Sequence, residues 1–313
     1  MRKFLLVFAV LACFSFSNQH LWGFYGHRKI TRMAIYTLPQ ELISFYKQNA
    51  ELIIEKSVAP DQRRYVIPEE GPRHYIDLDE YANPDSLPKY WFKAIEKFGE
   101  DTLLSRGIVP WYAYYTYKQL VKAFSENNYP KIIRKSSDLA HYLADANVPL
   151  HTTSNYNGQQ TGQNGIHGFW ETRLPQLYSD GYDFLVGQAN YLSDPQQAIW
   201  DDVLQAHALV DSVFIVERMV TAEVGESRKF AYEDRGRRTV KVYSEKFSQA
   251  YHQKMPVVEQ QMRKAIKLIG DCWFSAWVDA VQPDINNIEF NKPDETDSLK
   301  LASKIIPVRN HEH

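Results

Sequence analysis

The sequence has few cysteines, no excess of charge and, beyond its first residues, no long apolar run. Only two of its 313 residues are cysteines, Cys13 near the N-terminus and Cys272. A disulfide framework is therefore excluded. The formal net charge is −2, so no overall positive field marks the chain as a nucleic-acid-binding protein. No segment after the N-terminal one is long and apolar enough to span a membrane.

Internal repeats, low-complexity linkers and strand-like alternation are also scarce. Hydrophobic residues make up 44% of the chain and charged residues 24%, a balance typical of a folded globular protein. Aromatic residues reach 14%, which favours a thick core. A single all-α, multi-helix domain is therefore predicted for residues 22–285, followed by a polar tail over 286–313.

The N-terminus has the three parts of a secretory signal. Arg2 and Lys3 precede an apolar run over 4–14, and Ser15 and Ser17 provide small residues at a cleavage zone. We expect a signal peptide within residues 1–21, cleaved after 17 or 21, and an exported protein, periplasmic or extracellular. The alternatives are a buried N-terminal helix and lipoprotein anchoring at Cys13.

Helical periodicity dominates the rest of the chain. Helices are expected after His27, from Pro39, over 111–124 and 129–148, and through most of 190–225 and 238–284. Prolines, glycines and charges predict a long loop over 59–90, and turn formers predict a polar loop over 155–165.

Two blocks pair a histidine with a carboxylate four residues later. The first is His141-x3-Asp145, followed by Pro149 and His151; the second is His167-x3-Glu171. Residues four apart leave the same face of a helix, so each pair can share one ion. Such a pair is more often a surface hydrogen bond, but two pairs joined by a third histidine favour a metal site. Imidazole with carboxylate suits zinc.

Together with earlier residues these blocks resemble a known pattern. The sequence is similar to the superfamily of zinc-dependent phospholipase C and single-strand-specific zinc nucleases (S-one/P-one type), whose members are helical and bind three zinc ions. All nine positions are filled, in order: Trp22, His27, Asp61, His74, His141, Asp145, His151, His167 and Glu171.

The resemblance implies how the three zinc ions are shared. Asp61, His74, His141 and Asp145 would bind the first, and His151, His167 and Glu171 the second. Trp22 and His27, with Asp145 bridging, would bind the third. In the superfamily the tryptophan binds through its own amine and carbonyl, so it must be the first mature residue. Cleavage after Ser17 would leave four residues ahead of Trp22.

The resemblance also implies roles around the metals. Asp61 would orient the attacking water or accept its proton, and Arg64 would neutralise phosphoryl charge. Tyr75 would stack on a base and Asp77 would hydrogen-bond one. The alternative for Arg64 is a solvated loop arginine, and for Tyr75 it is core packing.

The predicted function is a zinc-dependent hydrolase of phosphoric ester bonds, with a lean towards a nuclease acting on single-stranded nucleic acid. The motifs His167-x-x-Trp-Glu171-Thr and Asp61-x-x-Arg64 favour the nuclease. Glu171 in place of aspartate, and Asn147, favour the alternative, a phospholipase C acting on phospholipid. A second alternative is a non-catalytic, zinc-stabilised exported binding protein. We expect a monomer without a dinucleotide cofactor.

Overall fold

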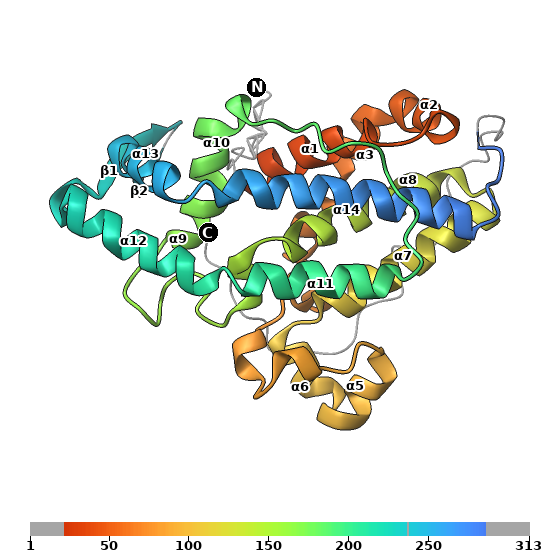
Figure 1. Ribbon diagram of the computed structural model, residues 1–313, viewed down its shortest axis with the longest axis horizontal. Helices are drawn as coiled ribbons and strands as arrows, with labels where there is room; N and C mark the ends of the chain where they lie inside the picture. The colour runs from red at the N-terminus through yellow and green to blue at the C-terminus, as the bar shows by residue number, and fades with distance from the viewer. Residues whose placement is uncertain (1–21, 237, 286–313) are drawn as a thin grey trace, which may run out of the picture.

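The computed structural model describes residues 22–236 and 238–285, and these are mostly helical (Figure 1). The prediction of an all-α fold is confirmed, since one short hairpin supplies the only strands among the described residues. None of the described helices has the length and apolarity needed to cross a bilayer. The predicted signal with Cys13 and the predicted tail over 286–313 lie outside the described residues.

The helices and strands follow one another along the chain with mostly short connections. The α-helices are α1 (Trp22–Ile35), α2 (Gln40–Gln48), α3 (Ala50–Lys56), α4 (Ala59–Arg63), α5 (Trp91–Phe98), α6 (Glu100–Arg106), α7 (Val109–Ser125), α8 (Tyr129–Ala146), α9 (Ile166–Gly168), α10 (Leu174–Tyr178), α11 (Pro195–His207), α12 (Val210–Val224), α13 (Glu245–Lys254) and α14 (Val257–Asp279). Tighter 3-10 turns are η1 (Pro68–His74), η2 (Leu78–Glu80), η3 (Pro84–Ser86), η4 (Pro149–Thr152), η6 (Ser179–Gly181) and η7 (Glu226–Arg228), and η5 (Phe169–Arg173) is a π turn. The strands are β1 (Phe230–Arg235) and β2 (Arg238–Tyr243).

Helices α7 and α8 form a helical hairpin at the centre of the fold. Asn128 caps α8, accepting a hydrogen bond of 3.1 Å from the Lys131 amide, and Pro130 occupies the first turn, where a missing N–H costs nothing. Most of α8 from Ile132 onwards is buried. A helix buried on nearly all faces holds its side chains in fixed directions, which suits it to present ligands.

The long helix α14 packs against this hairpin and runs across the middle of the view (Figure 1). It packs on α1, α7 and α8. The indole of Trp273 is buried, and its Nε1 donates to the Ser136 carbonyl at 3.1 Å. Gln261 Nε2 donates to the Asn147 carbonyl, just past the end of α8, at 2.7 Å. Helix α8 is therefore fixed at both its middle and its C-terminal end.

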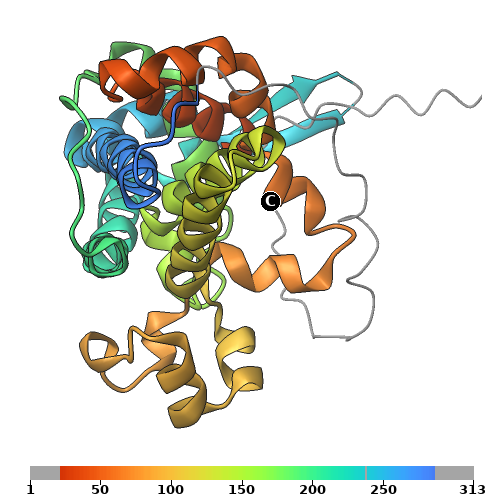
Figure 2. The same ribbon diagram turned by 90° about the vertical axis from the view of Figure 1, so that its right-hand side faces the viewer.

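Helices α5 and α6 lie outside the main bundle, at the lower end of both views (Figures 1 and 2). The chain returns from them through Gly107, whose φ of +85° favours glycine. A Cβ there would lie 2.2 Å from the Tyr75 carbonyl oxygen. Backbone hydrogen bonds of 2.7 Å from Asp77 to Arg106 and from Ile108 to Pro72 join the two segments. This close crossing fixes the end of η1.

The structure differs from the predicted elements in two places. The segment 59–90, predicted as a loop, contains α4 and three 3-10 turns, because prolines at helix starts permit single turns. The predicted helix from residue 238 is wrong over its first residues, which form β2, antiparallel to β1. Thr239, Val240 and Val242 are β-branched, which favours a strand, and Gly236 at φ +65° lies in the turn before them.

Candidate metal centre

Eight of the nine predicted ligand side chains fall within the described residues, and all eight converge. They are His27 on α1, Asp61 on α4, His74 on η1, His141 and Asp145 on α8, His151 on η4, His167 on α9 and Glu171 on η5. The ninth position, Trp22, is the first residue of α1. Buried side chains from seven elements therefore form three groups that can each hold a metal ion.

The first group consists of Asp61, His74, His141 and Asp145. His74 Nδ1 lies 3.0 Å from both His141 Nε2 and Asp145 Oδ2, and the last two atoms are 3.3 Å apart. Asp61 Oδ1 lies 3.8 Å from His74 Nδ1 and 3.9 Å from His141 Nε2. Tetrahedral zinc with bonds of about 2.0–2.2 Å requires ligand atoms roughly 3.3–3.6 Å apart. The four side chains therefore fit a zinc ion with adjustments of a few tenths of an ångström.

Backbone carbonyls determine which nitrogen two of the histidines present. His141 Nδ1 lies 2.9 Å from the Ser57 carbonyl oxygen, and His151 Nδ1 lies 2.5 Å from the His74 carbonyl oxygen. A carbonyl only accepts, so each Nδ1 carries a proton, which leaves Nε2 as the nitrogen that can bind a metal. Both Nε2 atoms are directed into the centre.

The second group consists of His151, His167 and Glu171. Glu171 places Oε1 2.8 Å from His151 Nε2 and Oε2 3.0 Å from His167 Nε2. Glu171 lies in the π turn η5, and Pro175 follows four residues later. Because proline cannot donate to the carbonyl four residues back and its ring crowds that carbonyl, the helix widens at Glu171.

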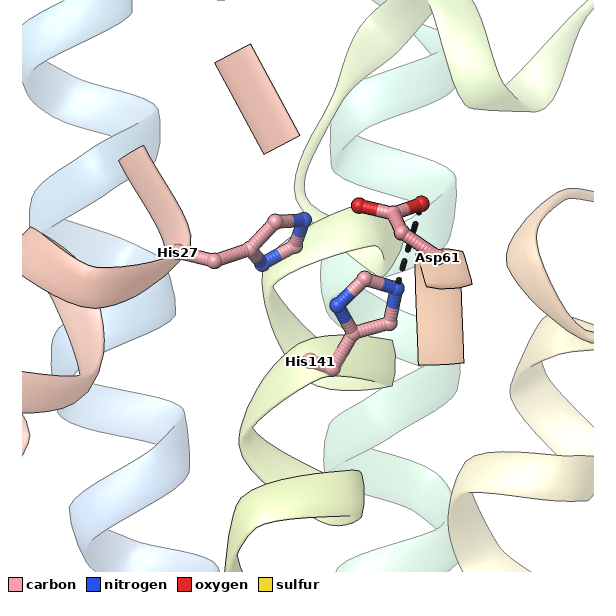
Figure 3. Close-up of side chains that lie close together, drawn as sticks. All are labelled: His27, Asp61 and His141. Atoms are coloured by element: carbon pink, nitrogen blue, oxygen red, sulfur yellow. Dashed lines mark ion pairs between the residues drawn. The ribbon is translucent and has the colours of Figure 1, made fainter. Parts of the chain in front are cut away.

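His27 lies beside Asp145 and His141. Its Nε2 is 3.2 Å from Asp145 Oδ1, and its ring stacks on that of His141 with centroids 4.0 Å apart. His27 also groups with Asp61 and His141 in a geometry that can hold an ion (Figure 3). The 3.2 Å contact agrees with the implied third site, in which Asp145 bridges: its Oδ2 points to the first group and its Oδ1 to His27.

The carboxylates and histidines of the centre shift one another's pKa values. Burial raises the pKa of Asp145, but His141 and His151 lower it further, so it lies well below its ordinary value. Glu171 follows the same pattern, its pKa lowered by His167 and His151 against the effect of burial. The pKa of His151 is raised to about 9, against burial, by Glu171 and Asp145. The carboxylates are therefore ionised and ready to ligate, whereas metal binding at His151 must displace a proton.

The centre is most open at Asp61. Its side chain is 14% exposed and that of Arg64, one turn later, 11%, whereas the other seven ligand side chains are 7% exposed or less. Arg64 Nη1 lies 3.9 Å from Asp61 Oδ1. Burial raises the pKa of Asp61, but His141, Arg64 and His74 hold it below its ordinary value. Asp61 is therefore the most solvent-accessible of the eight side chains, with the predicted catalytic residue Arg64 beside it.

Tyr75 and Asp77, predicted to bind a nucleobase, lie inside the fold. Tyr75 is 3% exposed, its backbone is crossed by Gly107, and its hydroxyl donates to the Ser105 carbonyl at 3.5 Å. Asp77 is likewise buried. The position of Tyr75 fits the alternative of core packing, and neither side chain is exposed to a base in this conformation.

One buried carboxylate beside the centre was not found from the sequence. Glu70 Oε1 lies 3.9 Å from His74 Nε2, on the side of the ring away from the metal ligands. Burial raises the pKa of Glu70, but Arg63, His74 and Arg73 lower it to about 2. The same four-residue spacing of carboxylate and histidine occurs here as in the predicted ligand pairs. This spacing brings two side chains together only in a helical segment, and residues 59–90 were predicted to be a loop.

Comparison with known proteins adds little to this geometry. No protein family matches the chain by sequence, nor does any curated protein. Among solved structures, the alpha toxin from Clostridium absonum matches with 14% sequence identity and a TM-score of 0.49, over 83% of this chain. The chain spans 65% of the length of that toxin. A likeness of this degree carries no information about activity.

Proposed function

We propose that this protein is a zinc-dependent hydrolase of phosphoric esters. The observation that carries the proposal is the convergence of three histidine–carboxylate groups, without cysteine, from seven elements. Structural zinc sites favour four closed ligands and cysteine, whereas catalytic sites favour histidine and carboxylate with a position left for water. The second group consists of two histidines and one glutamate, which is a ligand set found in catalytic zinc sites.

Zinc ions bound here would lower the pKa of a water and neutralise charge on a phosphoryl group and its leaving oxygen. The chain supplies the remaining functions. The Asp61 carboxylate, on the open side of the centre, orients the attacking water and accepts its proton. Arg64 places a guanidinium beside it to bind the phosphate oxygens and balance their developing charge. The buried histidines behind exclude bulk water, which strengthens both interactions.

The favoured substrate is a phospholipid, which makes phospholipase C the better of the two predicted activities. The lean towards a nuclease came from the motifs around Glu171 and Arg64, and a nuclease would also use Tyr75 and Asp77 to bind a base. Both of these side chains are buried, which weakens the case for a nuclease. In addition, Tyr65 and Val66 follow Arg64 directly and are among the exposed large apolar side chains. Apolar groups next to the opening of a phosphate site suit a lipid substrate better than a polyanion.

The proposal is tested by metal analysis and parallel assays of the purified protein. We expect zinc to co-purify and the protein to release diacylglycerol from phosphatidylcholine vesicles, with a chelator abolishing release and added zinc restoring it. Cleavage of single-stranded DNA or RNA without lipid hydrolysis would replace the phospholipase with the nuclease. Bound zinc without turnover of any phosphoric ester would leave only a zinc-stabilised binding protein.

A further inference from the structure

Behind the first metal group lies a buried network of charges centred on Glu70. Arg73 Nη1 donates to Glu70 Oε2 at 2.7 Å, and Arg63 contacts both carboxylate oxygens at 3.3 and 3.4 Å. The hydroxyl of Tyr142 donates to Oε1. Arg63 also donates to Asp138 Oδ1 at 2.9 Å. Glu70 is only 1% exposed, so these partners hold its carboxylate in one orientation.

The two ring nitrogens of His74 have different surroundings. Nδ1 is directed at the metal group, within 3.9 Å of ligand atoms from Asp61, His141 and Asp145. Nε2 is buried and makes no hydrogen bond to any described residue, and the Glu70 carboxylate lies 3.9 Å from it. When Nδ1 gives its lone pair to a metal, Nε2 must carry the proton. Glu70 is the neighbouring acceptor, and a shift of about 1 Å on metal binding would bring it within hydrogen-bonding distance.

The geometry points to Glu70 as a positioning residue for the metal centre. We infer that Glu70 accepts the Nε2 proton of His74, which fixes the tautomer and ring direction that present Nδ1 to zinc. Of the two histidines in the first group, His141 is oriented by a backbone carbonyl, whereas His74 depends on a side chain for this purpose.

The network also joins the elements that supply the first metal group. Arg63 is on α4 with Asp61, Glu70 and Arg73 are on η1 with His74, and Tyr142 is on α8 beside His141. Glu70 therefore links, through one carboxylate, all three segments that carry ligands of that group. Without the Glu70 carboxylate, the three segments would be held less firmly relative to one another. The tautomer of His74 would also no longer be fixed.

Glu70→Gln is the informative variant, studied in the full zinc-loaded protein. Glutamine keeps the size of the side chain but replaces one oxygen acceptor with a donor. With Arg73 requiring the remaining oxygen, the amide NH2 faces His74 Nε2 and opposes its protonation. By analogy with other outer-shell carboxylates, we expect one zinc to bind about 10- to 100-fold more weakly in a chelator competition, while the remaining zinc is unchanged. In the cobalt-substituted protein, the visible absorption of one site should change.

Glu217→Gln is the matched control. Glu217 is also 1% exposed and pairs with a buried lysine, Lys229, at 2.7 Å, but it contacts no metal ligand among the described residues. We expect this variant to lower the melting temperature and leave zinc affinity unchanged. Equal zinc affinity in Glu70→Gln and the wild type would overturn the inference, and so would equal loss in both variants.

Two further outcomes remain decisive. If Glu70→Gln does not fold, Tyr142→Phe keeps the packing and removes the hydroxyl that holds Glu70; weaker zinc binding at one site supports the inference, and unchanged binding overturns it. The inference depends on the zinc binding in the proposed function. Wild-type protein without zinc overturns both, whereas fully loaded wild type with an unaffected Glu70→Gln overturns the inference alone.

Discussion

The two carboxylate oxygens of Asp145 face different neighbours, Oδ1 facing His27 and Oδ2 facing His74. A substitution at this position should therefore disturb the centre more than one at any other ligand. We predict that Asp145→Asn removes at least one zinc ion per molecule and lowers any hydrolytic activity by more than about 100-fold, because an amide offers one neutral oxygen where two anionic ones were used. Elemental analysis of the purified variant measures this. Asp211→Asn, at an exposed position of α12, is the control and should keep its full metal content.

A variant of Arg64 can distinguish an effect on the reaction from an effect on metal binding. Its guanidinium lies beside Asp61 on the open side of the centre and is not part of any metal group. We predict that Arg64→Ala keeps its zinc and lowers kcat by about 100-fold, the usual loss when one donor to a developing charge is removed. Arg28→Ala, which removes a surface pair with Glu55, should leave kcat unchanged. Equal kcat in both variants would contradict the role of Arg64.

Asp202 predicts a dependence of stability on pH that is independent of the metal ligands. Burial raises its pKa from 3.8 to about 6, assisted by Asp201 and Asp271 and opposed by a hydrogen bond to Asn147 and by Lys264. A carboxyl with a raised folded-state pKa is favoured in its protonated form, so its ionisation destabilises the fold as pH rises from about 4 to 6. Above pH 6 the cost is constant.

The corresponding variant is Asp202→Asn. It should raise the free energy of unfolding at pH 7 by about 1–2 kcal/mol, less than a full two-unit shift implies because the side chain is partly exposed. Chemical denaturation at pH 4 and pH 7 measures the effect, which should be small at pH 4. Asp201 is exposed, so Asp201→Asn should change the free energy of unfolding equally little at pH 4 and at pH 7.

Residue identity and spacing predicted which side chains converge, because imidazole and carboxylate pairs four apart project from one helical face. They did not predict which side of the centre meets solvent. Tyr75 follows a ligand histidine and has the composition of a stacking residue, but the crossing at Gly107 buries it. That crossing is a contact between segments thirty residues apart, which local patterns do not contain.

At the scale of elements, the segment η1 depends on the loop that crosses it. We predict that Gly107→Ala lowers the free energy of unfolding by about 2–4 kcal/mol, because the added Cβ meets the Tyr75 carbonyl in addition to the strain of a positive φ. Gly99→Ala isolates the second effect, since Gly99 has φ +79° and no atom within 4 Å of the added Cβ. It should cost only about 1–2 kcal/mol. Similar losses in the two variants would show that the crossing adds nothing.

The elements themselves were predicted where helical spacing is long and uninterrupted, as in α7, α8 and α14. The prediction was wrong at β2, where the β-branched residues Thr239, Val240 and Val242 were included in a helix predicted from the residues that follow. The π turn at Glu171 was also not predicted, although Pro175 four residues later is its cause. Both errors arise where a short local signal lies next to a stronger helical one.

At the scale of the whole molecule, the centre joins segments from residue 27 to residue 171. Zinc present at about 1,000 times its dissociation constant would stabilise the fold by roughly 4 kcal/mol for each ion. We predict that a chelator lowers the melting temperature by about 10 °C or more, with helical content at 25 °C preserved by the apolar core. Calorimetry and circular dichroism test this. An unchanged melting temperature after complete zinc removal would show that the ions contribute nothing to the fold.

The shared carboxylate of Asp145 also has a thermodynamic consequence. An ion that binds Oδ2 fixes the direction of Oδ1, so the neighbouring ion finds its ligand already oriented, whereas two cations on one carboxylate repel each other. Occupancy of the two positions is therefore coupled, and the coupling is reciprocal: each ion changes the affinity for the other by the same factor. A titration of the apoprotein should consequently not follow a curve for independent, identical sites, and the sign of the departure reports whether orientation or repulsion prevails.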